Sequence, residues 1–310
     1  MTAQVQPSVT AGLSCYTAAL HGYLAQEWDA TAVLARSVRL AVRAADTGVR
    51  LAFSHHYPPL DLLPDRSRLV YAGAGSGLAA LPGIAAELER HGRVIVVADS
   101  ARLPWSVQRG GPASPHWLLV TDRAARGWWV VDDFTALQSA GEQLPYRGWL
   151  EDSTLAGAMT LPPGWPQPAH RLRNTLAFGA PVPVPQQGAL WLRRQDGPAD
   201  GRSLDRDAGW QIGEAAALAF LIQRAGAHQA VIAEHLDDLW AVAGHQWFAC
   251  RWELGQPVGD AERARLEAAL TRWSALPRVL RMAVDSAARG RPRTSLVLAA
   301  LAGLAEVANR

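Results

Sequence analysis

Cys15 is one of only two cysteines in the chain, and it opens the helical run of the segment GLSCYTAALHGYLA (residues 12–25). A thiolate is an effective nucleophile when its charge is stabilised, as happens at a helix N-terminus beside an imidazolium. The position of Cys15 meets the first of these two conditions. We therefore take Cys15 as a candidate nucleophile, with an inert packing residue as the alternative.

His116 is the candidate partner for this thiol, because it is the one histidine of nine that directly begins a predicted strand, HWLLVTD (116–122). A second short strand, GWWVVDDF (127–134), follows after RAARG (123–127), a length suited to a hairpin loop. An imidazole placed there can exchange protons with a thiol, whereas a histidine with satisfied hydrogen bonds is the structural alternative. The pairing of the two strands then decides which carboxylate lies near His116.

The register of this hairpin selects between two adjacent aspartates. If Asp122 faces Trp128, then Asp132 lies diagonally across from His116 on the same face of the sheet, and Asp133 points to the other face. A carboxylate in the first position holds the imidazole in the tautomer that catalysis needs. Because a slip of one residue exchanges the two aspartates, the register favours Asp132 and leaves Asp133 as the alternative.

The elements that must position these side chains follow an α+β order, with helices first and an antiparallel sheet after them. Apolar residues recur at helical spacing in residues 14–27, 30–45 and 76–92. Short β-branched and aromatic runs bounded by turn residues occupy 92–100, 116–122 and 127–134. We therefore expect a cleft between the helix that begins at Cys15 and the sheet.

The rest of the chain divides by composition. Residues 151–205 are rich in proline and glycine, so we expect a connecting segment with one or two short strands. Residues 206–310 have a helical pattern, in which Asp260 and Thr294 are predicted N-caps. The predicted organisation is a catalytic domain over 1–150, the connecting segment, and a helical C-terminal domain.

Composition excludes several classes of chemistry. The chain has 310 residues, of which 49% are hydrophobic and 19% charged, and its net charge is +2, so it lacks the signature of a nucleic-acid-binding arm or a disordered tail. All 30 basic residues are arginine. The absence of lysine rules out a Schiff-base lysine, a pyridoxal phosphate anchor and the lysine of a phosphate-binding P-loop.

The N-terminal segment MTAQVQPSVTAG has neither the basic nor the apolar region of a signal peptide, and no apolar run is long enough to span a membrane. We therefore expect a cytoplasmic protein that contacts neither membrane nor nucleic acid. Cys15 and Cys250 stand in different sequence contexts, so both are expected to be free thiols. Two cysteines are too few for a four-cysteine zinc site.

The order of a cysteine at a helix start, a histidine on a strand and an aspartate at the end of the next strand resembles the papain-like superfamily, and within it the bacteriocin-processing (C39-like) peptidases. The nearer resemblance is to the butirosin biosynthesis protein H-like (BtrH-like) family. In that family a similar cysteine helix is followed by segments like GAGSGLAAL (73–81) and VVADSARLPW (96–105). The segment AVAGHQWFACRWEL (241–254) is similar to part of that family's helical second domain.

This resemblance implies a catalytic triad of Cys15 as nucleophile, His116 as general base and acid, and Asp132 as the carboxylate that orients His116. BtrH-like proteins transfer an acyl group from an acyl carrier protein thioester to an amine. The resemblance therefore implies an acyltransferase of natural-product or antibiotic biosynthesis, with the acyl group delivered on the phosphopantetheine of a carrier protein or on a CoA-type thioester. It implies no metal and no other cofactor.

One departure from the papain pattern concerns the oxyanion. Papain-type enzymes place a glutamine six residues before the cysteine, and here that position is Val9, while Gln6 lies three residues further upstream. Without that amide, the backbone N–H of Cys15 and a neighbouring donor must stabilise the oxyanion. The departure weighs against a peptidase more than against thioester exchange. A thioesterase, a cyclase and a non-catalytic scaffold of the same fold remain alternatives, and the sequence leaves the oligomeric state open.

Several further features are assigned structural roles. GAGSG (73–77) lacks the full spacing of a dinucleotide-binding loop and is interpreted as a turn that lines the cleft. The histidines and aspartates of EHLDDLWAVAGH (234–245) are interpreted as a solvated helix face rather than a metal site. SHHYPP (54–59) is either a loop or part of a substrate path, and Trp105 either core or cleft wall. The arginine-rich segment 272–293 suits either solvent or an acidic carrier protein.

Overall fold

The computed structural model describes residues 9–45, 49–138, 141–197, 204, 209–228 and 230–309. The chain forms two compact units that alternate along the sequence. The first unit comprises Met1–Thr31, Asp61–Thr175 and Val182–Asp200, and the second comprises Ala32–Leu60, Leu176–Pro181 and Gly201–Arg310. The chain leaves the first unit twice before its end, over Ala32–Leu60 and over Leu176–Pro181, so this division differs from the expected boundaries at 150 and 205.

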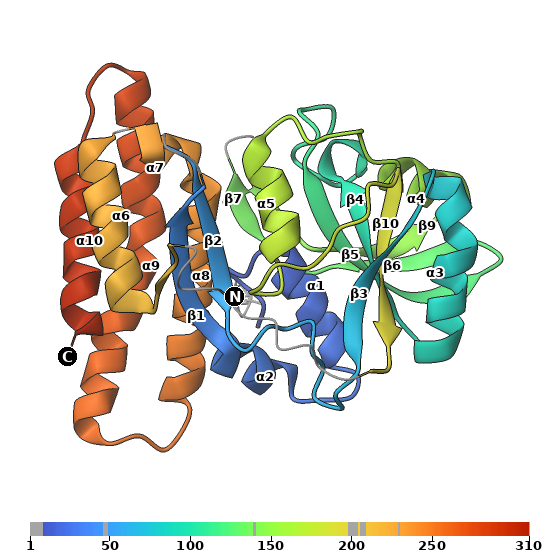
Figure 1. The fold of residues 1–310 in the computed structure, drawn as a ribbon, viewed down its shortest axis with the longest axis horizontal. Coiled ribbons are helices and arrows are strands. Elements are labelled where there is room, and N and C mark those ends of the chain that lie inside the picture. The colour runs from blue at the N-terminus through green and yellow to red at the C-terminus, as the bar shows by residue number, and fades with distance from the viewer. Residues whose placement is uncertain are drawn as a thin grey trace, which may run out of the picture. The chain divides into compact units, whose positions relative to one another are not determined.

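A six-stranded antiparallel sheet forms the centre of the first unit, with the strand order β3-β10-β4-β5-β6-β9 (Figure 1). Its strands are β3 (Arg68–Ala74), β10 (Ala189–Gln195), β4 (Val94–Asp99), β5 (Pro115–Ala124), β6 (Gly127–Asp132) and β9 (Tyr146–Leu150). Two short strands, β7 (Ala136–Gln138) and β8 (Gly141–Gln143), pair separately. The predicted α+β class and its antiparallel sheet are confirmed.

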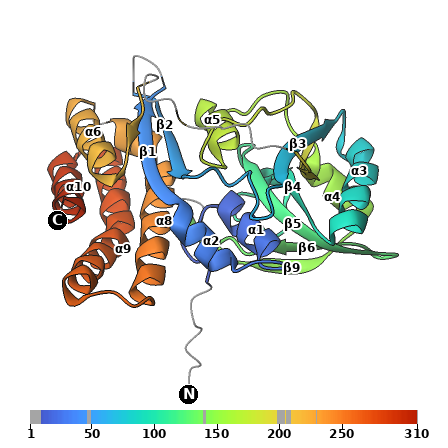
Figure 2. The same cartoon turned by 60° about the horizontal axis from the view of Figure 1, so that its bottom comes forward.

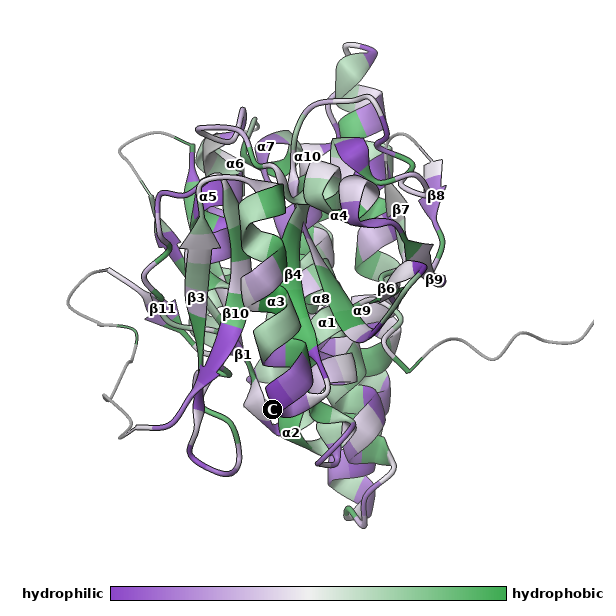
Figure 3. Ribbon diagram, turned by 90° about the vertical axis from the view of Figure 1, so that its right-hand side faces the viewer, coloured by the Kyte–Doolittle hydropathy of each residue, from purple (hydrophilic) through white to green (hydrophobic). Residues whose placement is uncertain are grey.

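Helices cover both faces of this sheet (Figure 1). On one face α1 (Cys15–Leu24) packs against β5, where the Tyr16 ring meets Trp117 edge-on at 5.6 Å and Gly22 leaves room for Leu119. On the other face α3 (Gly77–His91) and α4 (Asp152–Met159) enclose a buried apolar cluster with the central strands. All six residues of β4 are buried, and β4 is coloured hydrophobic along most of its length in Figure 3.

Most of the segment expected to connect two domains is part of the first unit, while Leu176–Pro181 belongs to the second. The segment forms α4, α5 (Pro168–Leu176) and β10, and β10 lies between β3 and β4 in the sheet. The residues Ala189–Leu192 are buried. Proline and glycine are frequent on both sides of them, so the average composition of the segment does not indicate where a strand lies. The segment was expected to contain one or two short strands, and β10 is one of them; its place between β3 and β4 follows from pairing with strands distant in the sequence.

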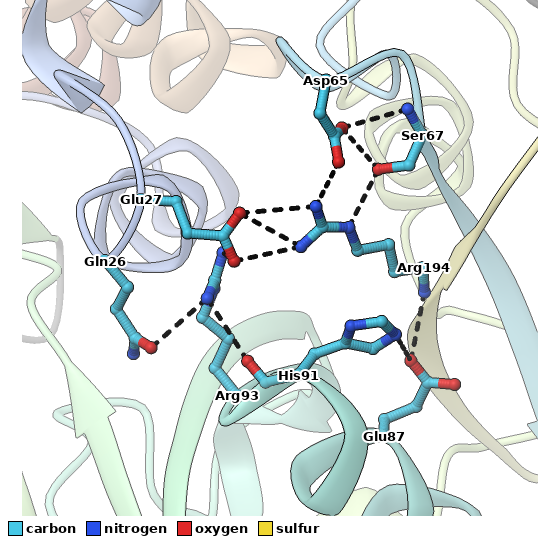
Figure 4. A network of polar contacts seen from close by, with 8 residues as sticks. All are labelled: Gln26, Glu27, Asp65, Ser67, Glu87, His91, Arg93 and Arg194. Carbon is cyan, nitrogen blue, oxygen red and sulfur yellow. Dashed lines mark hydrogen bonds and ion pairs between the residues drawn. The ribbon is translucent and has the colours of Figure 1, made fainter.

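A polar network ties the end of β10 to the region that follows α1 (Figure 4). The Arg194 guanidinium donates hydrogen bonds to the carboxylates of Glu27 and Asp65, and Glu27 also pairs with Arg93 at 2.8 Å. Arg93 and Arg194 are largely buried, whereas the two carboxylate side chains are 38% exposed. Each guanidinium thus has an acidic partner, and the network fixes the end of α1 to the sheet.

The second unit contains a three-stranded sheet and a helical layer (Figure 2). The sheet has the order β11-β1-β2, with β11 (Gln211–Ile212), β1 (Val38–Ala44) and β2 (Leu51–His56). The helices are α2 (Ala30–Ser37), α6 (Glu214–Ala227), α7 (Ala230–Glu234), α8 (Leu236–Leu254), α9 (Asp260–Ala288) and α10 (Thr294–Ala308). The helical character predicted for the C-terminal part is confirmed, and its core is shared with β1 and β2.

The predicted helix over 30–45 is wrong in its second half. Helix α2 ends at Ser37, and Val38–Ala44 forms β1, whose residues Leu40 and Val42 are both buried at the spacing of a strand. Arginine and alanine on either side imitate a helical pattern, but pairing with β2 and β11 selects the strand. The predicted N-caps are one residue late, since Asp260 and Thr294 are the first residues of their helices.

Three buried histidines lie together in the second unit. His55 and His56 belong to β2, and the His245 ring from α8 stacks on His55 with ring centroids 4.6 Å apart. The SHHYPP histidines are therefore in a strand and not in a loop. Burial lowers the pKa of His245 to about 4 and, with the charges of the neighbouring histidines, holds the pKa of His56 well below its ordinary value. Both imidazoles are thus neutral in the folded protein at neutral pH.

This cluster makes the fold sensitive to acid. Unfolded histidine binds a proton near pH 6.5, so the free energy of unfolding contributed by His245 is present above that pH and is lost as the pH falls towards 4. We expect the urea midpoint to fall less between pH 6.5 and 4.5 in His245→Gln than in the wild type. His228→Gln, at an exposed position, is the matched control. An equal fall of the urea midpoint between pH 6.5 and 4.5 in all three proteins would contradict the prediction.

Candidate active site

Cys15 is the first residue of α1, and Ser14 is its N-cap with extended backbone angles. The side chain of Cys15 is partly exposed, whereas Cys250 is buried in α8 of the second unit. Burial, together with the charges of Glu214 and Glu253, raises the pKa of the Cys250 thiol to about 12. Both cysteines are free, as expected, but only Cys15 combines access with a helix N-terminus.

The hairpin of β5 and β6 brings His116 and Asp132 into direct contact. The distance from His116 Nε2 to Asp132 Oδ2 is 2.8 Å, and both side chains are buried. When Nε2 carries a proton, in either the neutral or the charged imidazole, it donates a hydrogen bond to the carboxylate. Nδ1 is then the ring nitrogen left for the thiol.

The predicted strand pairing is wrong near the turn and right near the site. Asp122 faces Trp129 instead of Trp128, because the strands continue to Ala124 and Gly127 and leave a shorter loop than RAARG. An irregularity between Val120 and Asp122 takes up one residue. Beyond it Leu119 faces Val131, which is the register from which Asp132 was selected.

Asp133 is directed elsewhere. Its carboxylate accepts hydrogen bonds from the Arg147 guanidinium at 2.9 and 3.0 Å, and the Arg147 side chain is well exposed. An exposed ion pair of this kind contributes little to stability. Of the two adjacent aspartates, Asp132 is therefore the one in contact with His116.

The environment of His116 favours its charged form. Burial alone would lower the pKa of His116, but the charge and hydrogen bond of Asp132, together with a side-chain hydrogen bond and the charge of Cys15, raise that pKa to about 10. The three predicted site residues thus form one chain of contacts, in which His116 lies between the thiol and the carboxylate. A thiolate beside an imidazolium is the arrangement that activates a cysteine nucleophile.

Two neighbouring residues complete the contacts of Asp132. The indole Nε1–H of Trp105 donates to Asp132 Oδ2 at 2.8 Å, and the backbone N–H of Phe134 donates to Oδ1 at 3.3 Å. The Phe134 ring also meets the imidazole of His116 edge-on, at 5.5 Å between centroids. Sequence reasoning placed Trp105 in the core or on a cleft wall and missed this hydrogen bond. The available signal was a partly buried indole, which needs an acceptor.

The region expected to bind the oxyanion is only partly described. Val9 has an exposed apolar side chain that offers no hydrogen-bond donor, and Gln6 lies outside the described residues. Tyr71 is buried near Cys15, and its hydroxyl donates to the backbone oxygen of Asn174 at 3.0 Å. Burial and the charge of Cys15 raise the pKa of Tyr71 well above its ordinary value, so this neighbour of the thiol stays neutral.

The glycine-rich segment after β3 has a structural explanation. Ser76 is the N-cap of α3 and accepts a hydrogen bond from the Ala79 N–H at 3.2 Å. A Cβ on Gly77 would lie 2.6 Å from the Ala156 carbonyl carbon, so glycine permits the close approach of α3 and α4. The predicted turn is therefore confirmed only at Gly75 and Ser76, because Gly73 and Ala74 end β3 and Gly77 begins α3.

His235, in the segment EHLDDLWAVAGH (234–245), is a structural residue. His235 Nε2 accepts the Leu51 N–H at 2.9 Å, and Nδ1 lies 2.8 Å from Asp238. Both side chains are buried, so the expected solvated helix face is wrong. No group of three or more potential ligands that could hold a metal ion occurs in the part of the chain that the structure describes. None of the helices over those residues is long and apolar enough to cross a membrane.

Neither a known protein family model nor a curated protein sequence matches the chain.

Proposed function

We propose that this chain is a cysteine-dependent acyltransferase with a papain-like catalytic unit of the BtrH-like kind. The observation that carries the proposal is the chain of contacts from Cys15 through His116 to Asp132. In the first half-reaction the Cys15 thiolate attacks the carbonyl carbon of a carrier-protein or CoA-type thioester. The donor sulfur leaves with the proton of the His116 imidazolium, and the acyl group stays on Cys15 as a new thioester. The backbone N–H of Cys15, at the start of α1, is the proposed donor to the oxyanion.

The second half-reaction uses His116 in the opposite sense. The hydrogen bond and the charge of Cys15 contribute to the high pKa of His116, and acylation removes the thiolate charge. The pKa of His116 therefore falls in the acyl-enzyme, and its neutral form takes the proton of an attacking amine. Transfer to the amine regenerates the thiolate. Asp132 keeps its hydrogen bond to His116 Nε2 throughout and holds the imidazole in place.

The partners of this reaction follow from the same proposal. The donor is an acyl group on the phosphopantetheine of an acidic carrier protein, and the acceptor is a small amine in a cytoplasmic biosynthetic pathway. The arginine-rich segment 272–293 of the second unit is the proposed docking surface, since Arg272, Arg278 and Arg289 are exposed there.

The proposal is tested by the covalent intermediate. The protein is mixed with acyl pantetheine thioesters of several chain lengths and examined by intact mass and peptide mapping. We expect an acyl adduct on the Cys15 peptide that disappears when a primary amine is added and yields the corresponding amide. Cys15→Ala should carry no adduct, while Cys250→Ala should behave like the wild type. Release of free acid alone would indicate a thioesterase, and the absence of any adduct would favour a scaffold.

A further inference from the structure

Trp105 contacts the site but has no role in the proposed reaction steps. Its Nε1–H donates to Asp132 Oδ2, the same oxygen that receives His116 Nε2, and both distances are 2.8 Å. The backbone N–H of Phe134 binds the other oxygen. With a donor on each oxygen, the buried carboxylate is held against rotation.

The indole of Trp105 is itself held by an aromatic stack. It lies parallel to the Tyr146 ring, with a centroid distance of 3.8 Å and an interplanar angle of 6°. The Tyr146 ring lies over Gly148, where a Cβ would come within 2.8 Å of Tyr146 Cζ. Glycine at this position of β9 therefore gives the tyrosine room to lie along the strand and support the indole.

The loop that carries Trp105 is anchored on both sides. Before Trp105, the fully buried side chain of Leu103 holds the loop in the core of the unit, and Asp99 accepts the Ala101 N–H at 3.0 Å. After Trp105, the Val107 N–H donates to the buried side chain of Gln143 at 3.2 Å. The direction of the indole N–H is therefore set before any substrate arrives, which is the condition for a group that positions another.

We propose that Trp105, supported by Tyr146 and Gly148, is a positioning residue that fixes the Asp132 carboxylate in the orientation that holds the His116 imidazolium beside Cys15. This inference rests on the proposed function for its catalytic meaning. The positioning itself needs no substrate: without the indole donor the carboxylate of Asp132 rotates more freely. A carboxylate that rotates more freely holds the His116 imidazolium less well, which weakens the thiolate–imidazolium pair at acidic pH.

The test is the rate of iodoacetamide labelling of Cys15 between pH 4 and 9 in the full-length protein. In Trp105→Phe, which keeps an aromatic ring but lacks the N–H, we expect the acid limb of the profile to move upward by about one pH unit. Trp129→Phe is the matched control, because Trp129 lies on the same strand as Asp132 and its ring packs against Trp149. The control should keep the wild-type profile.

A second variant keeps the inference testable if Trp105→Phe folds poorly. Gly148→Ala leaves the indole intact but displaces Tyr146, so its acid limb should move in the same direction by a smaller amount. An unmoved acid limb in Trp105→Phe, or an equal movement in Trp129→Phe, would overturn the inference. The acyl-transfer proposal fails separately, through the absence of an acyl adduct in the wild-type protein.

Discussion

His116→Ala is expected to lower the turnover of an acyl pantetheine thioester by about 10³-fold or more. The imidazole has two tasks in the proposed cycle, because it stabilises the thiolate in the first half-reaction and carries the proton in both. General acid–base catalysis alone is worth roughly 10²–10⁴-fold. Loss of the imidazolium partner also returns the thiol towards an ordinary cysteine, of which only about 0.3% is thiolate at pH 6.

The same variant separates the two tasks. Iodoacetamide needs the thiolate but no proton transfer to a leaving group, so labelling of Cys15 at pH 6 should slow by about 10- to 100-fold and recover at pH 9. The estimate is smaller than the change in thiolate fraction, because a more basic thiolate is also a better nucleophile. Turnover should not recover at pH 9.

His91→Ala is the matched control for this variant. His91 ends α3 in the same unit, and its Nε2 lies 3.8 Å from Glu87. We expect its turnover and labelling to match those of the wild-type protein. Equal labelling of Cys15 at pH 6 in His116→Ala and the wild type would mean that the contact between the two side chains does not activate the thiol.

The sequence predicted the local parts of the site well. Cys15 opens a helix because small and apolar residues recur behind it, and His116 lies on a strand because a run of large apolar residues, Trp117–Val120, follows it. The strand register near His116 was predicted correctly because two errors cancel. The loop is shorter than the predicted RAARG, and an unpredicted irregularity after Val120 restores the expected pairing. A bulge of this kind has no reliable signature in a single sequence.

The contacts that depend on distant parts of the chain were not predictable. Trp105 reaches Asp132 because the loop after β4 is anchored to a distant residue. The Val107 N–H of this loop donates to the side chain of Gln143, which lies 36 residues further along the chain. The places of β10 in one sheet and of β1 in the other follow likewise from long-range pairing, against the local composition. Periodicity predicts an element, whereas partners distant in sequence decide where it packs.

Asp132→Asn is expected to lower turnover by about 10²- to 10⁴-fold while Asp133→Asn leaves it nearly unchanged. The amide keeps the size of the carboxylate but lacks its charge, so the pKa of His116 falls and the imidazolium loses its main stabilising partner. An asparagine can also turn its NH₂ group towards Nε2, which favours the wrong tautomer. Asp133 binds Arg147 on the exposed side, so its loss removes only a weak ion pair.

The pH dependence distinguishes a loss of charge from a loss of structure. Because Asp132 helps to hold His116 in the charged form that stabilises the Cys15 thiolate, the acid limb of Cys15 labelling should move to higher pH in Asp132→Asn. A variant that merely loosens the sheet would lower the urea midpoint without this movement. If Asp133→Asn instead carried the loss of turnover and the altered profile, the assignment of Asp132 would be wrong, and the site would use the alternative register that a one-residue slip creates.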